Sequence, residues 1–283
     1  MKKVSIVVVT YRSAPEVGEA LASLGAHPRV AQGVYERIVV DNASGDETVV
    51  CVVEAAPNAR LLPLEQNRGF ATGANAGAAI ARGEYLLFLN PDATLAPEGL
   101  DRLVDYLEQR PRVAAVGPQL VDSNHAPQPG ARRFPTPSSE FARLWAPLAS
   151  VVGWRHREPE VKEDGGPVDW ISGACFLVRR DAWSHVGPMD SDFFLYFEET
   201  DWARRAWDKG WEVHHLPHAE AMHLGGTSTA REGELVSGCL VEHHRRSRRR
   251  YFRKHHGALG VAVVETLHAL RRVYEAVRRR RVS

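Results

Sequence analysis

The hydrophobic residues of the first 117 positions form short continuous runs, separated by segments in which apolar and polar residues recur at helical spacing. Continuous apolar runs of strand length are typical of parallel strands that are covered on both faces. The predicted strands are residues 4–9, 37–40, 59–64, 85–89 and 113–117. We therefore expect a parallel sheet at the centre of the fold.

Three segments between these runs have the features of helices. Residues 15–24 begin with a proline and residues 46–54 begin with an acid, and both features favour a helix N-terminus. Residues 97–109 place four apolar side chains on one face, Leu100, Leu103, Val104 and Leu107. Because strands and helices alternate, we predict the α/β class, with a Rossmann-like, doubly wound, mostly parallel sheet and helices on both faces.

Polar residues follow the ends of three predicted strands. Thr10 and Tyr11 follow the first strand, Asp41 follows the second, and Asp92 follows the strand at 85–89. Open α/β sheets bind their ligands at the carboxyl ends of the strands. These residues are therefore candidates for ligand contact, and Asp92 is placed to hold a cation against a diphosphate.

The chain beyond residue 117 has a weaker pattern. Residues 121–167 are rich in proline, arginine and serine and have little periodicity, which predicts a long loop or a lid. After it, the pattern predicts a buried strand at 168–178, a short helix at 199–209 and a strand at 211–216.

Composition narrows the class of protein. With 283 residues, 44% of them hydrophobic and 25% charged, the chain is long enough to bury a full core in at most two domains. No apolar run approaches the roughly 20 residues of a membrane span, and the run at 4–9 is too short for the core of a signal peptide. Three cysteines without a Cys-x-x-Cys pair suit a reducing compartment. We therefore expect a cytoplasmic protein.

Positive charge is concentrated near the C-terminus. Residues 245–281 contain thirteen Lys or Arg against two Glu, a local net charge of +11, whereas the whole chain carries +1. Such a segment favours contact with phosphate, most often in anionic lipid headgroups or nucleic acid. A basic helix that only faces solvent is an equally good interpretation.

The same segment has an apolar stripe. It consists of Val263, Leu267, Leu270, Tyr274 and Val277, at alternating spacings of four and three. This pattern predicts a helix that packs on a second copy of the chain, forming a homodimer, or lies peripherally on a membrane surface. We treat residues 227–283 as a basic helical C-terminal extension.

Six short motifs occur in a fixed order between residues 4 and 226. They are Val-Val-Val-Thr-Tyr (7–11), Val-Asp-Asn-Ala-Ser (40–44), Asn-Arg-Gly-Phe-Ala (67–71), Asn-Pro-Asp (90–92), Trp-Ile-Ser-Gly-Ala (170–174) and Phe-Glu-Glu-Thr-Asp (197–201). In this order they resemble the family 2 glycosyltransferases. The rhamnosyltransferase-like branch is the most similar, and its members also tend to carry a motif like that at 247–256.

The resemblance implies a GT-A catalytic domain at residues 1–226. Such a domain transfers a sugar from a nucleoside diphosphate donor with inversion at the anomeric carbon. dTDP-rhamnose is the leading donor, with UDP-linked sugars and other hexosyl or galactofuranosyl transfers as alternatives. The implied acceptor is a glycan or a polyprenyl-linked sugar, and the implied setting is cell-wall or polysaccharide biosynthesis. No nucleic acid partner is expected.

The resemblance also implies a divalent cation, Mg²⁺ or Mn²⁺, held by Asp92 and His223. The cation would neutralise charge that develops on the departing diphosphate. Asn90 stands where many members have a first carboxylate, so weaker metal binding is expected. An alternative is that residues 90–92 form only a turn and a cap for the helix near residue 97.

The nucleotide is expected across the first strand ends, at Thr10, Tyr11, Asp41, Arg68 and Asn90. An additional role for Asp41 is to cap the helix that begins near residue 46. Three glycines at four-residue spacing follow Arg68: they are Gly69, Gly73 and Gly77. We interpret them as a close helix-to-sheet contact rather than as chemistry.

Inverting displacement needs a carboxylate base near the acceptor hydroxyl. Motif position makes Glu199 this base, with Glu198 beside the acceptor and Asp201 paired with Arg204 or Arg205. An acidic first helical turn, favoured by the helix dipole, is the alternative. Three further residues resemble the acceptor wall of the family: Trp170, Ser172 and Gly173. A tryptophan buried in the core is the alternative for Trp170.

Two other classes remain to be compared. A different nucleotide-dependent enzyme is disfavoured, because the chain has neither a Gly-x-Gly-x-x-Gly after its first strand nor a Gly-x-x-x-x-Gly-Lys-Ser/Thr phosphate loop. A non-catalytic nucleotide- or sugar-binding protein is the second alternative, and it predicts that Asp92 and Glu199 are dispensable. The chain also lacks the Gln-x-x-Arg-Trp signature of processive synthases.

Overall fold

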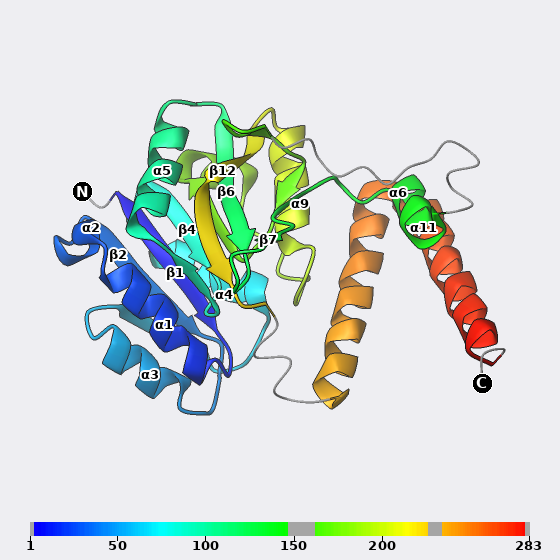
Figure 1. Cartoon of the computed structure of the whole chain (residues 1–283), viewed down its shortest axis with the longest axis horizontal. Helices are drawn as coiled ribbons and strands as arrows, with labels where there is room; N and C mark the ends of the chain where they lie inside the picture. Colours follow the sequence, from blue (N-terminus) through cyan, green and yellow to red (C-terminus); the bar gives the residue numbers. More distant parts are fainter. Residues whose placement is uncertain (1–2, 147–161, 226–233, 281–283) are drawn as a thin grey trace.

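The computed structural model describes residues 3–146, 162–225 and 234–280, and these form a mixed α/β body with a helical C-terminal arm (Figure 1). The strands are β1 Val4–Thr10, β2 Tyr35–Asp41, β3 Arg60–Pro63, β4 Tyr85–Leu89, β5 Ala93–Leu95, β6 Val113–Val121, β7 Pro127–Gln128, β8 Ala131–Arg132, β9 Gly166–Pro167, β10 Trp170–Ile171, β11 Cys175–Arg179 and β12 Glu212–His223. The helices are α1 Ala14–Gly25, α2 Pro28–Ala31, α3 Thr48–Ala55, α4 Phe70–Ile80, α5 Pro97–Glu108, α6 Pro137–Leu144, α8 Arg180–Val186, α9 Glu198–Asp208 and α11 Glu234–Arg280.

The main sheet follows the order β3-β2-β1-β4-β11-β6-β12-β5. The pairs within β3-β2-β1-β4 are parallel, so the alternation of the first 90 residues predicted this half correctly. Strand order reverses next to β1, which is where an open α/β sheet forms its ligand crevice. Thr10, Asp41 and Asn90 all lie at or just beyond the carboxyl ends of these strands.

Each face of the sheet has its own hydrophobic core. Along β1, Val8 faces the core covered by α1, α3 and α5, whereas Val7 and Val9 face the core covered by α4, α8 and α9. Two glycines of α4 allow this helix to pack closely against Val7 and Val9 of β1. A Cβ at Gly73 would lie 2.6 Å from Cγ1 of Val9, and one at Gly77 would lie 2.4 Å from Cγ1 of Val7. The predicted helix-to-sheet contact is therefore confirmed for these two positions.

Three expectations for the second half of the domain were wrong or incomplete. The strand predicted at 168–178 is two strands, β10 and β11, separated by a turn at 172–174. The strand predicted at 211–216 continues to His223, with irregular register between Leu216 and Glu220. The predicted loop at 121–167 contains β7, β8, β9 and α6, and its residues 147–161 lie outside the described part of the chain.

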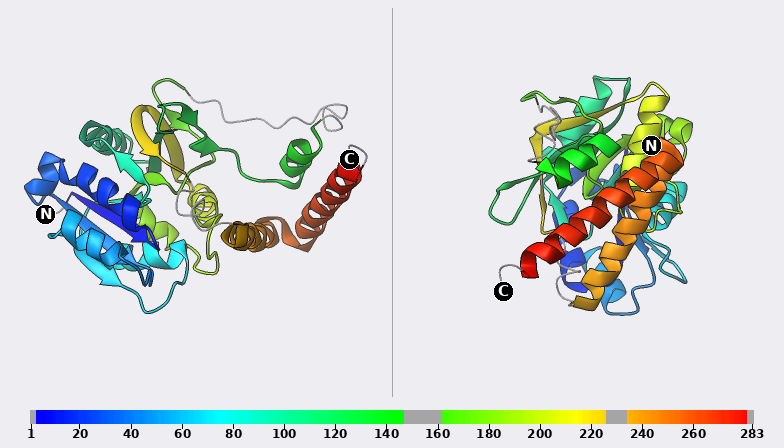
Figure 2. Two further views of the ribbon diagram at one scale, coloured as in Figure 1. Left: turned by 60° about the horizontal axis from the view of Figure 1, so that its bottom comes forward. Right: turned by 90° about the vertical axis from the view of Figure 1, so that its right-hand side faces the viewer.

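The C-terminal extension is helical, as predicted. α11 bends at Gly257, whose φ of 68° is outside the helical range, and so it consists of two helical segments. The first segment contributes Tyr251 and Phe252 to a small core with Phe193 of the body. α6 packs against α11, and Figure 2 shows the two helices side by side, away from the main sheet. None of the described helices is both long and apolar enough to cross a membrane.

Candidate active site

Two strand ends are fastened together beside the crevice. Thr10, the last residue of β1, donates from Oγ1 to Oδ1 of Asp41 at 3.2 Å. Asp41, the last residue of β2, also accepts from the backbone N–H and the hydroxyl of Ser44. Its carboxylate therefore holds the turn at 41–44 and does not cap α3, which begins later, at Thr48. The side chain of Asp41 is buried, whereas that of Tyr11 is 38% exposed at the same edge.

A second loop is tied to this turn. Oδ1 of Asn42 accepts from the N–H of Arg68 at 3.2 Å, and the amide of Asn42 donates to the carbonyl of Gly69 at 3.1 Å. Gly69 has a φ of 85°, and a Cβ there would lie 2.0 Å from the carbonyl oxygen of Phe194. Only glycine fits this contact. The exposed Arg68 side chain thus stands on a rigid backbone between β2 and the aromatic loop at 193–197.

The end of β4 brings together the two predicted metal ligands. Oδ1 of Asp92 lies 3.4 Å from Nε2 of His223, and the carbonyl of Asp92 accepts from the N–H of Leu224 at 3.1 Å. Residues 90–93 do form a turn, in which the N–H of Ala93 donates to the carbonyl of Asn90. α5 begins later, with Ala96 at its N-cap, so Asp92 does not cap it. Beside this turn, Asp92 and His223 place one carboxylate oxygen and one imidazole nitrogen close together, and both are atoms that can bind a metal ion.

This pair fits a divalent cation that takes its other ligands from substrate. The Asp92 side chain is 10% exposed and that of His223 is 18% exposed, so both are held in place but reachable. Mg²⁺ sites commonly use one or two protein ligands together with phosphate oxygens and water. Within the described residues no group of three or more His, Cys, Asp or Glu side chains is arranged to hold a metal. The donor set therefore suits a cation that arrives with a diphosphate.

Glu198 and Glu199 begin helix α9 after a strained turn. Tyr196 and Phe197 both have positive φ, 70° and 71°, an uncommon conformation for bulky residues that often marks functional sites. Burial raises the pKa of Glu199 to about 7, while hydrogen bonds from backbone N–H groups, including that of Gly173, and the charge of Arg132 oppose the rise. Burial, together with the neighbouring Glu199, raises the pKa of Glu198 well above its ordinary value.

Glu199 has the properties of a general base. Its Oε2 atom is buried and has no hydrogen-bond partner among the described residues, so one carboxylate lone pair is available to a substrate hydroxyl. A pKa near neutrality is suited to accepting a proton at physiological pH. These properties do not depend on the position of Glu199 in a motif.

Backbone contacts link Glu199 to the end of β4. A Cβ at Gly173 would lie 3.8 Å from the carboxyl carbon of Glu199. The next residue, Ala174, accepts a hydrogen bond from the N–H of Asn90 at 2.9 Å. The loop at 172–174 therefore lies between the base candidate and the Asn90-Pro91-Asp92 turn, although the two acids are more than one hundred positions apart.

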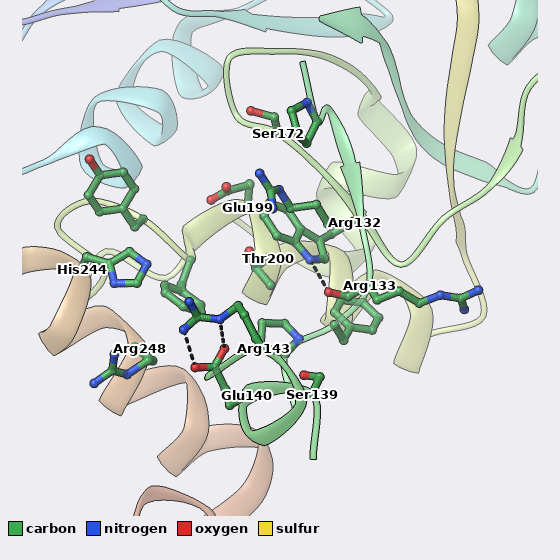
Figure 3. Close-up of a pocket in the computed structure, with 16 residues that line it drawn as sticks. Arg132, Arg133, Ser139, Glu140, Arg143, Ser172, Glu199, Thr200, His244 and Arg248 are labelled. Carbon is green, nitrogen blue, oxygen red and sulfur yellow. Dashed lines mark hydrogen bonds and ion pairs between the residues drawn. The ribbon is translucent and has the colours of Figure 1, made fainter. Parts of the chain in front are cut away.

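Trp170, Ser172 and Glu199 line one cavity of about 500 Å³ (Figure 3). The Trp170 ring is only partly buried and packs beside the guanidinium of Arg132, 5.9 Å from the ring centroid. Its Nε1 donates to the carbonyl of Arg133 at 2.9 Å. The alternative of a tryptophan wholly inside the core is therefore wrong, since the ring lines the cavity.

Several residues of this cavity could not be predicted from the sequence. They include Arg132, Arg143, Tyr196, His244 and Arg248, which come from β8, α6, the aromatic loop and α11. The only signals in the sequence were an arginine pair next to a proline-rich stretch and the basic C-terminal motif. Neither signal shows which arginines turn toward Glu199.

Asp201 has a structural role that was predicted only in part. Its Oδ2 lies 2.9 Å from Nε of Arg205, as helical spacing indicated, while Arg204 pairs with Asp208 instead. Asp201 also contacts Lys254 and His255 of α11. The basic motif at 247–256 thus fastens the C-terminal arm to the helix that carries Glu199.

Comparison with known proteins identifies the family to which the chain belongs. Residues 5–187 match the family described as "Glycosyl transferase family 2". The chain is 32% identical, over 259 residues, to the N-acetylglucosaminyl-diphospho-decaprenol L-rhamnosyltransferase of Mycobacterium tuberculosis, covering 85% of this chain and 81% of that protein. It is 23% identical to the low-salt glycan biosynthesis hexosyltransferase of Haloferax volcanii, covering 77% of this chain and 66% of that one.

Solved structures share the fold. A mannosyltransferase from Pyrobaculum calidifontis in complex with GDP-Man and Mn²⁺ is similar with a TM-score of 0.57 at 19% identity, covering 95% of this chain and 74% of that one. GalNAc-T7 with UDP, GalNAc and Mn²⁺ gives a TM-score of 0.61 at 17% identity, covering 79% of this chain and 44% of that one. At these identities the likeness concerns the fold alone.

Proposed function

The chain belongs to glycosyl transferase family 2, and from this premise we propose that it moves a rhamnosyl group from a nucleoside diphosphate donor to a sugar carried on a polyprenyl diphosphate. It is a glycosyltransferase with the GT-A fold. The choice of rhamnose and of a lipid-linked acceptor is supported by the mycobacterial relative, whose name gives both. dTDP-rhamnose is the proposed donor.

The observation that carries this proposal is the placement of two kinds of site around the loop at 172–174. On one side the Asp92–His223 pair offers ligands for a cation. On the other side Glu199 has a free buried oxygen in the wall of a cavity. A sugar transferase needs both, because the leaving diphosphate and the attacking hydroxyl lie on opposite faces of the transferred sugar.

We assign the donor to the strand ends. Tyr11 is exposed beside the buried Thr10–Asp41 pair, and Arg68 stands on the loop fastened by Asn42. Thr10 and Asp41 shape this edge, so their role toward the base and ribose is exerted mainly through backbone groups. Arg68 supplies a cation for the base or the diphosphate, and Asn90 supplies a neutral oxygen near the metal ligands.

We assign the cation to Asp92 and His223. A bound Mg²⁺ or Mn²⁺ would neutralise the negative charge of the leaving diphosphate. Asp92 accepts no other side-chain donor than His223 among the described residues, so its carboxylate is available to a cation.

We assign the proton transfer to Glu199. Its free oxygen takes the proton of the acceptor hydroxyl, while hydrogen bonds from the N–H groups of Thr200 and Gly173 hold the carboxylate in place. Glu198 is the more deeply buried of the pair, at 4% exposed, and does not line the cavity, so Glu199 is the one placed to meet the acceptor. Trp170 offers a partly exposed ring on which the acceptor sugar stacks.

We also propose that the second half of α11 lies peripherally on an anionic membrane surface. Six apolar side chains are at least 40% exposed on this segment: Leu259, Val263, Leu270, Val273, Tyr274 and Val277. Arginines interleave with them, including Arg271, Arg272 and Arg278. Apolar side chains bordered by arginine suit a helix in the headgroup region, where a lipid-linked acceptor resides.

A donor panel tests the proposed function. Purified protein is incubated with dTDP-rhamnose and with UDP- and GDP-linked hexoses, with and without Mn²⁺, and release of the nucleoside diphosphate is followed. We expect metal-dependent release that is fastest with dTDP-rhamnose and is stimulated by a prenyl diphosphate-linked N-acetylglucosamine. Fastest release from another donor would show that rhamnose is not the transferred sugar. Absence of release from every donor, with nucleotide binding intact, would instead favour a non-catalytic binding protein.

A further inference from the structure

The cavity that contains Glu199 is walled on its far side by the C-terminal helices. It measures about 500 Å³ and is lined by residues of β8, the aromatic loop, α6 and α11 (Figure 3). This volume is within the range of sites that bind small molecules. An extension that only fastened the fold would not need to leave such a space beside the catalytic helix.

The lining is positively charged. It contains four arginines, Arg132, Arg133, Arg143 and Arg248, against two acids, Glu140 and Glu199. The excess is two positive charges, even with Glu199 fully ionised. A diphosphate that is esterified at both ends carries two negative charges at neutral pH, so the charge of the cavity is complementary to such a group.

Two of these arginines have donors that the protein leaves available. Arg132 forms no ion pair with any carboxylate that the structure describes, and its guanidinium stacks beside Trp170. Arg143 uses Nε and Nη2 to hold Glu140, which leaves its Nη1 group without a hydrogen bond among the described residues. Guanidinium groups favour phosphate because their N–H groups match two oxygens at once.

The other two arginines are less suited. Arg248 is committed to Glu265 at 2.8 Å and to His268 at 3.3 Å. Figure 3 shows the Arg133 side chain directed away from Glu199, whereas Arg132 lies beside Glu199 and Arg143 lies on the other side of Thr200. Arg132 and Arg143 therefore approach the same space from two different elements, β8 and α6.

We propose that Arg132 and Arg143 bind the diphosphate that joins the acceptor sugar to its lipid, so that the cavity selects acceptors by this group. The inference rests on the proposed function, since it specifies the acceptor of the same site. In a sugar linked through its anomeric carbon to a diphosphate, the attacking hydroxyl and the first phosphate are on one ring. Phosphate-binding groups must then lie close to the base, and Figure 3 shows Arg132 beside Glu199.

This arrangement would also couple binding to proton transfer. Burial raises the pKa of Glu199, and the charge of Arg132 limits that rise in the free protein. A bound diphosphate offsets that charge, so the carboxylate becomes a stronger base when the acceptor arrives. Arg132 therefore acts on the base as well as on the substrate.

The test compares two probes that differ only in the diphosphate. One is N-acetylglucosamine joined to geraniol through a diphosphate, and the other is the geranyl glycoside of the same sugar. Binding is measured by calorimetry without divalent cation, so that no metal bridges the phosphates. The variants are Arg132→Gln and Arg143→Gln, with Arg246→Gln as the matched control, because Arg246 is 71% exposed and does not line the cavity.

We expect the wild-type protein to bind the diphosphate probe at least about tenfold more tightly than the glycoside. Each cavity variant should reduce that preference by about tenfold or more, while Arg246→Gln keeps it. dTDP binding should be unchanged in all three variants, which separates this group from the donor's diphosphate. Melting temperatures check folding, and Arg132→Gln leaves no described acid without its partner.

Equal binding of the two probes by the wild-type protein would overturn the inference, as would variants that keep the preference. Equal weakening of both probes would also overturn it, because the arginines would then contact the sugar. Failure of the proposed function gives a different result. In that case no donor is consumed, while the binding preference still decides whether the cavity recognises a diphosphate.

Discussion

The Nε2 atom of His255 lies 2.8 Å from Oδ1 of Asp201, and this contact joins the C-terminal arm to the helix that carries Glu199. Asp201 is fully buried, and Lys254 and Arg205 contact it as well. A buried carboxylate with three cationic or polar partners is costly to leave incomplete. The arm is therefore joined to the body by a buried charged cluster and is not an independent appendage.

Asp201→Asn should destabilise the protein because it leaves Lys254 and Arg205 facing a neutral group in a buried setting. We expect the free energy of unfolding to fall by about 2–4 kcal/mol at pH 7, less than for a fully enclosed pair since Lys254 is 34% exposed. Equilibrium unfolding in urea measures this change in the free energy of unfolding. Asp208→Asn is the control, because Asp208 pairs with Arg204 on the exposed face of the same helix and should cost under about 0.5 kcal/mol.

Acid should remove the contribution of Asp201 to the free energy of unfolding. Burial would raise the pKa of Asp201, but hydrogen bonds from His255 and Lys254 outweigh it and hold the pKa at about 2, below the ordinary 3.8. The unfolded chain then binds a proton at a higher pH than the native state does, so stability is present above 3.8 and is lost as pH falls toward 2. Glu140 behaves alike, with a pKa of about 2. Melting temperatures from pH 7 to pH 3 should fall more steeply for wild type than for Asp201→Asn; parallel curves would contradict this account.

Glu199→Gln should remove the proposed base while keeping the shape of the side chain. We expect kcat to fall by about 10²–10⁴-fold, the usual contribution of a general base, with little change in dTDP binding. In the wild-type enzyme, activity should rise with pH through about 7, because burial raises the pKa of Glu199 to that value and only the ionised form accepts a proton. Glu198→Gln is the comparison. If it abolished activity while Glu199→Gln did not, the two roles would have to be exchanged.

The raised pKa of Glu199 affects stability in the opposite direction to the lowered pKa of Asp201. In the native state Glu199 keeps its proton up to about pH 7, while in the unfolded chain it releases it near the ordinary 4.5. Stability therefore decreases as pH rises between these values. Glu199→Gln, which cannot ionise, should be about 1–3 kcal/mol more stable than wild type at pH 8 and nearly equal to it at pH 4, below the unfolded pKa. Chemical unfolding at the two pH values would show whether the buried charge is costly.

The sequence predicted the parts of the fold that depend on local pattern. The runs predicted at 4–9 and 37–40 appear within β1 and β2, because strands covered on both faces have few polar residues to interrupt them. The pattern failed at 168–178, where one strand was predicted but the Ser172-Gly173-Ala174 turn separates β10 from β11. It could not show that β11 inserts antiparallel between β4 and β6 either, since strand order depends on contacts distant in sequence.

Residues of the candidate site that belong to sequence motifs could be predicted. Residues that come together only through tertiary packing could not. Asp92 and His223 were named from motifs, and the structure places them 3.4 Å apart. Arg132 and Arg143 belong to no motif; Arg132 is placed by the pairing of β8 with β10 and Arg143 by the packing of α6 against α11. The pairing of Asp201 with His255 likewise follows from how the bent helix returns to the body.

His223→Gln should weaken the cation site without unfolding the protein. We expect the Mn²⁺ concentration for half-maximal activity to rise by about tenfold or more, because an amide is a poorer metal ligand than imidazole. Asp92→Asn should have the larger effect, since it removes the only charge of the pair. His218→Gln is the control, as His218 is exposed on the same strand. An unchanged metal requirement in both ligand variants would place the cation elsewhere.

Val273→Glu should test the membrane proposal. Val273 is 62% exposed on the second half of α11, so the substitution adds a charge without disturbing the small core around Phe252. In flotation with vesicles containing anionic lipid, wild type should float and the variant should float severalfold less, because a glutamate is repelled by anionic headgroups and is costly beside acyl chains. Binding should also fall with salt. Flotation that ignores lipid charge would remove the proposal, and a dimer that Val273→Glu dissociates would assign the stripe to a second copy instead.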